Sequence, residues 1–232
     1  MEKGRVLALY LDAPLQSWGY HSRFDRRTTL SCPTRSGIIG MIAAAMGIKR
    51  DDTNGLARFN ATDMKILILA PTKGTILPGT ELTDFHTVGG GFDSKNQRRH
   101  LPRKASGDTP VTVVSRREYL QDAKFGVLLS DTPEFLAKID LALKNPVWGL
   151  FLGRKSCIPA VPICQGLFPA AAAATESIEN LSGWTVQGKI MTAETYAEGE
   201  NTIMDIPENF QERRYAPRRI RTEWVATDAV SK

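Results

Sequence analysis

The residues of this chain that are best suited to chemistry are arginines and lysines, and many of them gather in one segment. Residues 95–117 contain seven basic residues and one acid, which gives a net charge of +6. Because the whole 232-residue chain carries +5, the remainder carries −1. Such a local excess is typical of a surface that binds a polyanion, although a solvated basic loop is the simpler alternative. The basic residues of the segment are Lys95, Arg98, Arg99, Arg103, Lys104, Arg116 and Arg117.

Three other segments combine residue types that hold single-stranded RNA, in which cations bind the phosphates and aromatic rings stack on the bases. The first, residues 16–27, brings Trp18 close to several arginines. The second, residues 33–37, combines Arg35 with a helix start, where free backbone N–H groups favour a phosphate. The third is a basic turn at residues 153–156 that opens with a glycine. For Trp18, packing in the core is an equally good interpretation.

The sequence contains no familiar catalytic motif, but it leaves one enzymatic alternative open. A nucleophile elbow, a Walker loop and a zinc-protease motif are all absent. Three cysteines and three histidines are too few and too scattered for zinc, so we expect no metal and no cofactor. A metal-independent endoribonuclease needs only a histidine, lysine or tyrosine placed for acid–base work on a 2′-hydroxyl. Residues of that kind in or beside the basic segment are His86, His100, Lys104 and Tyr119.

The overall composition is that of an ordinary globular protein, with 42% hydrophobic and 24% charged residues. No apolar stretch approaches the roughly 20 residues that a membrane-spanning helix needs. The apolar run at residues 6–11 is too short for the core of a signal peptide, and no cleavage pattern follows it. We therefore expect a cytoplasmic protein that does not contact a membrane.

The predicted elements that position these segments follow the order strand, helix, strand, hairpin, strand, helix over residues 1–150. Thr34 and Gly47 mark the start and end of the first helix, because threonine caps free N–H groups and glycine tolerates a left-handed end. Thr132 followed by Pro133 marks the start of the second helix. This order predicts an α+β fold with a ferredoxin-like (RRM-like) domain. Its expected strands are residues 5–11, 65–70 and 124–130.

A long β-hairpin is expected as an insertion in this domain, at about residues 75–117. Residues 147–169 are expected to supply a last strand or a docked loop. A smaller β-rich C-terminal part, residues 151–232, is expected to pack on the domain and contains a second basic cluster. The predicted elements are hairpin arms at 83–88 and 111–115, a helix near 170–174, and strands at 184–191 and 220–226. The second cluster is Arg213, Arg214, Arg218, Arg219 and Arg221.

Four segments, taken in order, resemble a known protein family. They are PLQSWG at 14–19, PTRSGIIG at 33–40 with GIKRDD after its helix, DFHTV at 84–88 with REYL at 117–120, and LGRKSC at 152–157. In order and spacing they are similar to the Cas5 family of CRISPR-associated proteins, in its type I-E branch. The likeness covers about residues 6–159, and four such matches in order are unlikely to arise by chance.

The resemblance implies a ferredoxin-like domain whose hairpin forms a thumb, and a ribonucleoprotein role in antiviral defence. Members of this branch grip the 5′ handle of CRISPR RNA without cutting it. They also cap one end of the Cascade surveillance complex, contact its backbone and large subunits, and meet target DNA only through the complex. A related type I-C branch cuts precursor CRISPR RNA, so an endoribonuclease remains the alternative function.

The same resemblance implies a set of RNA contacts, and charge and position add further ones. Carried over from the family motifs are Gln16, Ser17, Trp18, Thr34, Arg35, Ser36, His86, Arg117, Arg154 and Lys155. Added from charge and position are Arg26, Arg27, Arg98, Arg99, Arg103, Lys104 and Arg116.

Overall fold

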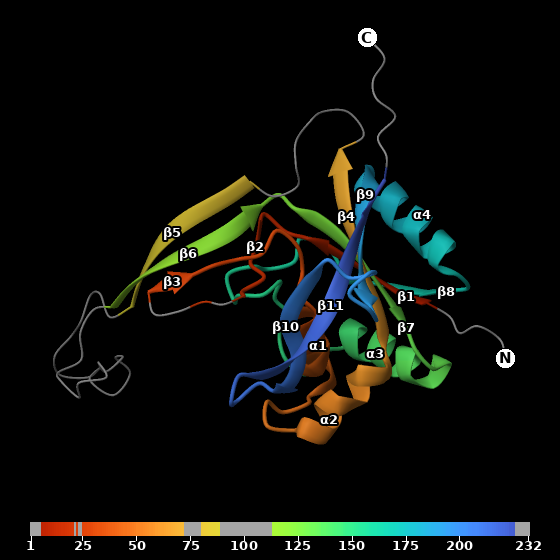
Figure 1. Cartoon of the computed structure of the whole chain (residues 1–232), viewed down its shortest axis with the longest axis horizontal. Coiled ribbons are helices and arrows are strands. Elements are labelled where there is room, and N and C mark those ends of the chain that lie inside the picture. The colour runs from red at the N-terminus through yellow and green to blue at the C-terminus, as the bar shows by residue number, and fades with distance from the viewer. Residues whose placement is uncertain (1–5, 21, 23–24, 72–79, 89–112, 226–232) are drawn as a thin grey trace, which may run out of the picture.

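The computed structural model of the chain describes residues 6–20, 22, 25–71, 80–88 and 113–225 (Figure 1). The expected hairpin tip lies outside these residues. So do four of the expected RNA contacts, namely Arg98, Arg99, Arg103 and Lys104.

A seven-stranded antiparallel sheet forms the centre of the molecule, with the strand order β10-β11-β9-β4-β7-β1-β8. The three strands expected near the N-terminus and the last strand expected at 147–169 are adjacent in it, as β8-β1-β7-β4. The strands after residue 183 extend the same sheet, so both expected parts of the chain share one hydrogen-bonded layer. The strands are β1 (Val6–Asp12), β4 (Asp63–Pro71), β7 (Lys124–Ser130), β8 (Cys164–Phe168), β9 (Trp184–Ala193), β10 (Asn201–Asn209) and β11 (Arg214–Trp224).

The two helices expected within residues 1–150 begin and end where the sequence predicts. In α1 (Arg35–Met46) the Thr34 side chain accepts a hydrogen bond from the Gly37 N–H, and Gly47 ends the helix with φ of 74°. Proline occupies the first turn of α3 (Pro133–Lys144), as expected. The helix α4 (Ala171–Ser182) extends well beyond the predicted residues 170–174. The short α2 (Thr53–Ala57), the 3-10 helix Arg58–Ala61 and strand β10 were not predicted.

Helices cover both faces of the sheet around β1, which explains why this strand is apolar from Val6 to Leu11. Successive side chains of a strand point to opposite faces, so β1 contributes to two separate cores. Leu7, Leu9 and Leu11 pack in the core that includes α1 and α3, whereas Ala8 and Tyr10 pack in the core that includes α4 (Figure 1).

The expected hairpin is present and projects away from the main sheet (Figure 1). Its arms, β5 (Thr80–Val88) and β6 (Val113–Gln121), pair antiparallel over nine residues each, which is longer than predicted. Two short strands, β2 (Leu15–Gln16) and β3 (Arg26–Arg27), add to β6 in the same small sheet. Within the described residues, no helix is both long and apolar enough to cross a membrane.

Candidate functional site

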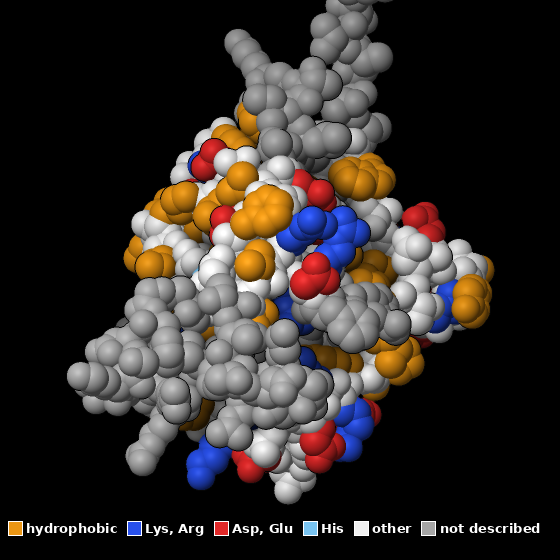
Figure 2. Space-filling view, turned by 90° about the vertical axis from the view of Figure 1, so that its left-hand side faces the viewer, with side chains coloured by type: hydrophobic (Ala, Val, Ile, Leu, Met, Phe, Trp, Pro, Cys, Tyr) orange, Lys and Arg blue, Asp and Glu red, His pale blue; other side chains and the backbone are white. Residues whose placement is uncertain are grey.

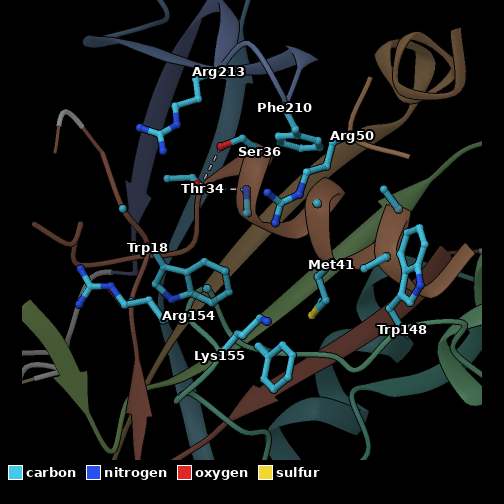
Figure 3. Close-up of a pocket in the computed structure, with 18 of the residues that line it drawn as sticks. Trp18, Thr34, Ser36, Met41, Arg50, Trp148, Arg154, Lys155, Phe210 and Arg213 are labelled. Atoms are coloured by element: carbon cyan, nitrogen blue, oxygen red, sulfur yellow. Dashed lines mark hydrogen bonds between the residues drawn. The ribbon is translucent and has the colours of Figure 1, made fainter. Parts of the chain in front are cut away.

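A pocket of about 980 Å³ lies where α1 meets the loop at residues 148–155, the turn after α1 and the β10–β11 turn (Figure 3). Among the described residues that line it, six are basic and none is acidic. Five are aromatic. This combination suits the phosphates and bases of a single-stranded nucleic acid. The basic residues are Arg27, Lys49, Arg50, Arg154, Lys155 and Arg213, and the aromatic residues are Trp18, Trp148, Phe151, Phe210 and Tyr215.

The floor of the pocket is a face of α1 made of small residues, so that aromatic rings lie directly on the helix. A Cβ atom at Gly37 would lie 2.9 Å from the indole Cε3 of Trp18, and one at Gly40 would lie 3.3 Å from Cζ of Phe210. Residues three apart share one face of a helix, which is why both glycines of the GIIG sequence are needed here. Ala43 and Ala44 continue the same lining.

The PLQSWG segment forms one wall of the pocket, and its Gln16, Ser17 and Trp18 side chains are buried behind that wall. Trp18 is only 1% exposed, and its indole nitrogen donates to Gln16 Oε1 at 3.2 Å. The Gln16 amide donates to the Ala123 carbonyl at 2.6 Å, and the Ser17 hydroxyl donates to the Glu118 carbonyl at 3.1 Å. The structure thus favours the core-packing interpretation of Trp18, and these three side chains hold the wall in place.

Arg35 faces the protein interior, in contrast to the solvent-facing phosphate ligand expected from the sequence. Its guanidinium is buried and donates to the Phe59 and Thr62 carbonyls at 2.7 and 2.8 Å. Burial lowers the pKa of Arg35, and the nearby Arg218 lowers it further. The contribution of Arg35 is therefore to anchor α1.

The first turn of α1 also has fewer free N–H groups than the sequence indicates. The Arg35 N–H donates to Asp205 at 2.7 Å, and the Gly37 N–H donates to the Thr34 hydroxyl at 3.1 Å. The Ser36 hydroxyl donates to Thr34 as well (Figure 3). Because Thr34 is itself buried, Ser36 is the polar side chain that this turn leaves at the pocket surface.

The basic turn at residues 153–156 supplies a second wall. Arg154 donates to the Glu118 carbonyl at 3.0 Å and to the Arg27 carbonyl at 2.6 Å, and its guanidinium lies 4.7 Å from the centre of the Tyr119 ring. Arg154 therefore ties this turn to the base of the hairpin. Lys155 is exposed and has its side chain at the pocket (Figure 3).

Strand pairing brings together four of the arginines expected from charge and motif at the base of the hairpin. Arg26 pairs with Arg116 and Arg27 with Arg117, because β3 runs parallel to β6. The Arg116 guanidinium lies 5.6 Å from the centre of the Phe85 ring, and Phe85 is 63% exposed. Figure 2 shows this side of the molecule, where basic side chains lie next to hydrophobic ones. His86, also on β5, is half-buried opposite Ser115.

The acid–base residues named for an endoribonuclease do not form a pair in the described part of the chain. His100 and Lys104 lie outside it. His86 pairs with Ser115 and Tyr119 pairs with Leu82, so they are four residues apart along the hairpin, roughly 13 Å. Tyr119 is also buried beneath Arg154. The two side chains therefore do not form an adjacent acid–base pair on the hairpin.

The cysteines are unsuited to nucleophilic chemistry. Burial raises the pKa of Cys32 to about 11, and burial together with the Asp140 carboxylate raises that of Cys164 to about 12. Burial likewise raises the pKa of Cys157. All three thiols are therefore protonated at neutral pH, whereas the thiolate is the reactive form. The described residues include no group of three or more potential metal ligands.

Several pocket residues were missed by the sequence analysis, and most of them gave little signal. Trp148 follows the end of α3 and is 48% exposed. Its backbone N–H donates to the Ala44 carbonyl. Arg50 lies in the quoted GIKRDD motif and Arg213 in the second basic cluster, so charge alone could have indicated them. Phe210 lies in the turn after β10, a strand that was not predicted, and Tyr215 lies in the part of β11 that precedes the predicted residues 220–226.

Comparisons with known proteins agree on one family. A family model described as CRISPR-associated protein (Cas_Cas5) matches residues 6–221. The CRISPR system Cascade subunit CasD of Escherichia coli (strain K12) is 31% identical over 230 residues, which cover 94% of this chain and 93% of that protein. A chain in a solved CRISPR RNA-guided surveillance complex is similar with a TM-score of 0.72 at 30% identity, over 94% of this chain and 89% of that one. A crystal structure of a Cas protein is similar with a TM-score of 0.62 at 29% identity, over 94% of both chains.

Proposed function

The chain belongs to the Cas5 family of CRISPR-associated proteins, and we propose that it is a non-catalytic RNA-binding subunit of a Cascade surveillance complex. In this proposal it grips the 5′ handle of CRISPR RNA and caps the backbone of the complex in antiviral defence. The observation that carries the proposal is the pocket beside α1, with six basic residues and no acidic one among its described lining. The backbone subunit and the large subunit are its protein partners, and target DNA is reached through the complex.

The arrangement of elements supports a ferredoxin-like assignment for the part of the chain that carries the pocket. The adjacent strands β8-β1-β7-β4 and the helices that follow β1 and β7 have the order β–α–β–β–α–β along the chain. The hairpin β5–β6 then takes the place of the thumb, inserted between the second and third of these strands. The remaining strands, β9, β11 and β10, carry the pocket's last wall on the turn between β10 and β11.

In this proposal the RNA follows one basic path from the pocket to the hairpin. Arg27 belongs to both regions, because it lines the pocket and pairs with Arg117 on β6. Exposed cations such as Lys155 bind phosphates along this path, since the phosphate backbone dominates the affinity of nucleic acids for proteins. At the hairpin base, the exposed Phe85 beside Arg116 offers a stacking surface.

Crosslinking in the assembled complex tests this function directly. Ultraviolet irradiation of a complex loaded with CRISPR RNA is expected to attach the 5′ handle to peptides that contain Arg50, Trp148 and Lys155, because all three line the pocket. The purified chain is expected to leave labelled repeat RNA intact. The attached peptides are identified by mass spectrometry, and cleavage is followed on denaturing gels.

Two results would replace the proposal. Cleavage of repeat RNA that is lost in His86→Ala, or in His100→Ala, would establish the endoribonuclease instead. A loaded complex with no RNA attached to the pocket or the hairpin would indicate a subunit that contacts only protein.

The exposed Trp148 is expected to stack on an unpaired base of the handle. Trp148→Ala should weaken RNA binding about tenfold, since a base–aromatic stack contributes about 1–3 kcal/mol. Trp148→Phe, which keeps a ring, should retain most of the affinity. Fluorescence anisotropy with labelled RNA measures both. Trp224→Ala is the matched control, because Trp224 is 65% exposed and does not line the pocket, and an equal loss in the control would remove the stack from the proposal.

A further inference from the structure

The turn between β10 and β11 carries two adjacent arginines with different surroundings. Arg213 lines the pocket and lies at the end where Ser36 is found (Figure 3). Arg214 instead forms two ion pairs. Its Nε lies 3.0 Å from the Glu208 carboxylate, and its Nη1 lies 2.7 Å from the Glu212 carboxylate. Among the described residues, Arg214 therefore has acidic partners, whereas Arg213 has none and faces the pocket.

The backbone of this turn is held in a conformation that fixes Arg213. Arg213 has φ of 55°, a left-handed value that costs a residue with a side chain about 1 kcal/mol or more. The Glu212 N–H donates to the Asn209 side chain at 2.9 Å, which closes the turn. Residues held in this way cluster at sites where a side chain must be aimed.

The turn is also docked on the segment that follows α1, which carries Arg50. The Phe210 N–H donates to the Arg50 carbonyl at 3.0 Å, and the Phe210 ring lies against Gly40 of α1. Phe210 packs edge-on against Tyr215, with 6.2 Å between the ring centres. The backbones at Arg50 and Arg213 are thus fixed relative to each other by contacts on both sides.

Both arginines line the part of the pocket where Tyr215 lies. Burial raises the pKa of the Tyr215 hydroxyl, and the charges of Arg213 and Arg50 both act to lower it, so both lie within electrostatic reach of that hydroxyl. Neither arginine forms an ion pair with an acidic residue in the described part of the chain. Figure 3 shows both at the same end of the pocket, with Ser36 between them.

We propose that Arg50 and Arg213 together hold one phosphate group of the RNA backbone, so that the β10–β11 turn completes the RNA site. Two guanidiniums from different elements suit a single phosphate, because each presents planar N–H donors that match its oxygens. The proposal rests on the proposed RNA-binding function and adds to it a site that is built by the C-terminal strands.

The test compares Arg213→Ala with Arg214→Ala in the full chain, using labelled single-stranded repeat RNA and fluorescence anisotropy over a range of salt concentrations. Arg213→Ala is expected to weaken binding about tenfold, because a charge-assisted contact to phosphate is lost. Arg214→Ala is expected to bind like the unmodified chain. Both side chains are exposed, and the ion pairs that Arg214→Ala removes are exposed as well, so both variants should unfold within a few degrees of the unmodified chain.

A double variant tests whether the two arginines share one phosphate. The slope of log affinity against log salt should become less steep by about 0.7 in the Arg50→Ala, Arg213→Ala variant, which is the value for one phosphate on a single strand. A change of about 1.4 would mean two separate phosphates and would overturn the shared site. If the unmodified chain binds RNA and Arg213→Ala binds equally well, this site is wrong and the proposed function stands. If neither the unmodified chain nor the assembled complex binds RNA in a salt-dependent manner, the proposed function itself fails.

Discussion

Replacing Gly153 with alanine is expected to lower the free energy of unfolding by about 3 kcal/mol or more and to abolish RNA binding. Gly153 has φ of 97°, which favours glycine, and a Cβ atom there would overlap the carbonyl oxygen of Ser17. That oxygen belongs to the backbone and cannot move aside. The Ser17 N–H also donates to the Leu152 carbonyl at 3.1 Å, so separating the two segments breaks a buried hydrogen bond. Chemical denaturation and RNA titration of the variant measure the two effects.

The chain contains a matched control for this substitution. Gly166 in β8 has the same φ of 97°, but a Cβ atom there would meet nothing within 4 Å. Gly166→Ala therefore carries the conformational cost without the collision, and it should lose only about 1 kcal/mol. RNA binding should be unaffected, because Gly166 does not line the pocket. Equal losses in the two variants would show that contact with Ser17 is not what requires glycine at position 153.

The LGRKSC segment was recognised in the sequence, but its close approach to Ser17 was not predicted. The segment reads as a basic turn, and its charges suggest phosphate contacts. In the structure, Gly153 allows the segment to pack against the wall formed by Ser17 and Trp18. Arg154 donates hydrogen bonds to two backbone carbonyls. Residue type indicates which groups are charged, but only the tertiary fold decides which of them remain available to a ligand.

Local signals predicted the local structure well. The ends of α1 follow from Thr34 and Gly47, whose side-chain and backbone preferences act within one turn of the helix. The pairing of β5 with β6 was also predicted, because residues 83–88 and 111–115 are the two most strand-like segments of a single insertion. The proximity of Arg50 and Arg213 in the pocket was not predicted, since these residues are 163 positions apart in sequence. No periodicity links segments at that separation.

Strand β10 shows why the C-terminal half gave a weak signal. It contains Asp205 and Pro207, both of which disfavour a strand assignment. Proline is tolerated here because β10 lies at the edge of the sheet, where the pairing with β11 is irregular around Pro207. Asp205, one of the two residues that disfavour the strand assignment, is buried, with an exposed fraction of 1%.

Asp205→Ala is expected to destabilise the protein by about 3–5 kcal/mol, because it leaves a buried charge without its partner. The Asp205 carboxylate accepts two hydrogen bonds from the Arg218 guanidinium, at 2.6 and 3.1 Å, and a third from the Arg35 N–H that begins α1. The carboxylate thus links β10 and β11 to the helix that floors the pocket. Loss of this link should also weaken RNA binding, and urea denaturation followed by RNA titration measures both effects.

The cause of the loss can be separated from the simple removal of an ion pair. Glu208→Ala breaks an exposed ion pair on the same strand, between Glu208 and Arg214, and should lose less than about 1 kcal/mol. Adding Arg218→Met to Asp205→Ala removes the unpaired charge, so this double variant should be more stable than Asp205→Ala alone. If instead the double variant is the less stable of the two, burial of an unpaired guanidinium is not the source of the destabilisation. The destabilisation would then come from two other losses. One is the hydrogen bond from the Arg35 N–H to Asp205, which both the single and the double variant lack, and the other is the packing of the Arg218 side chain.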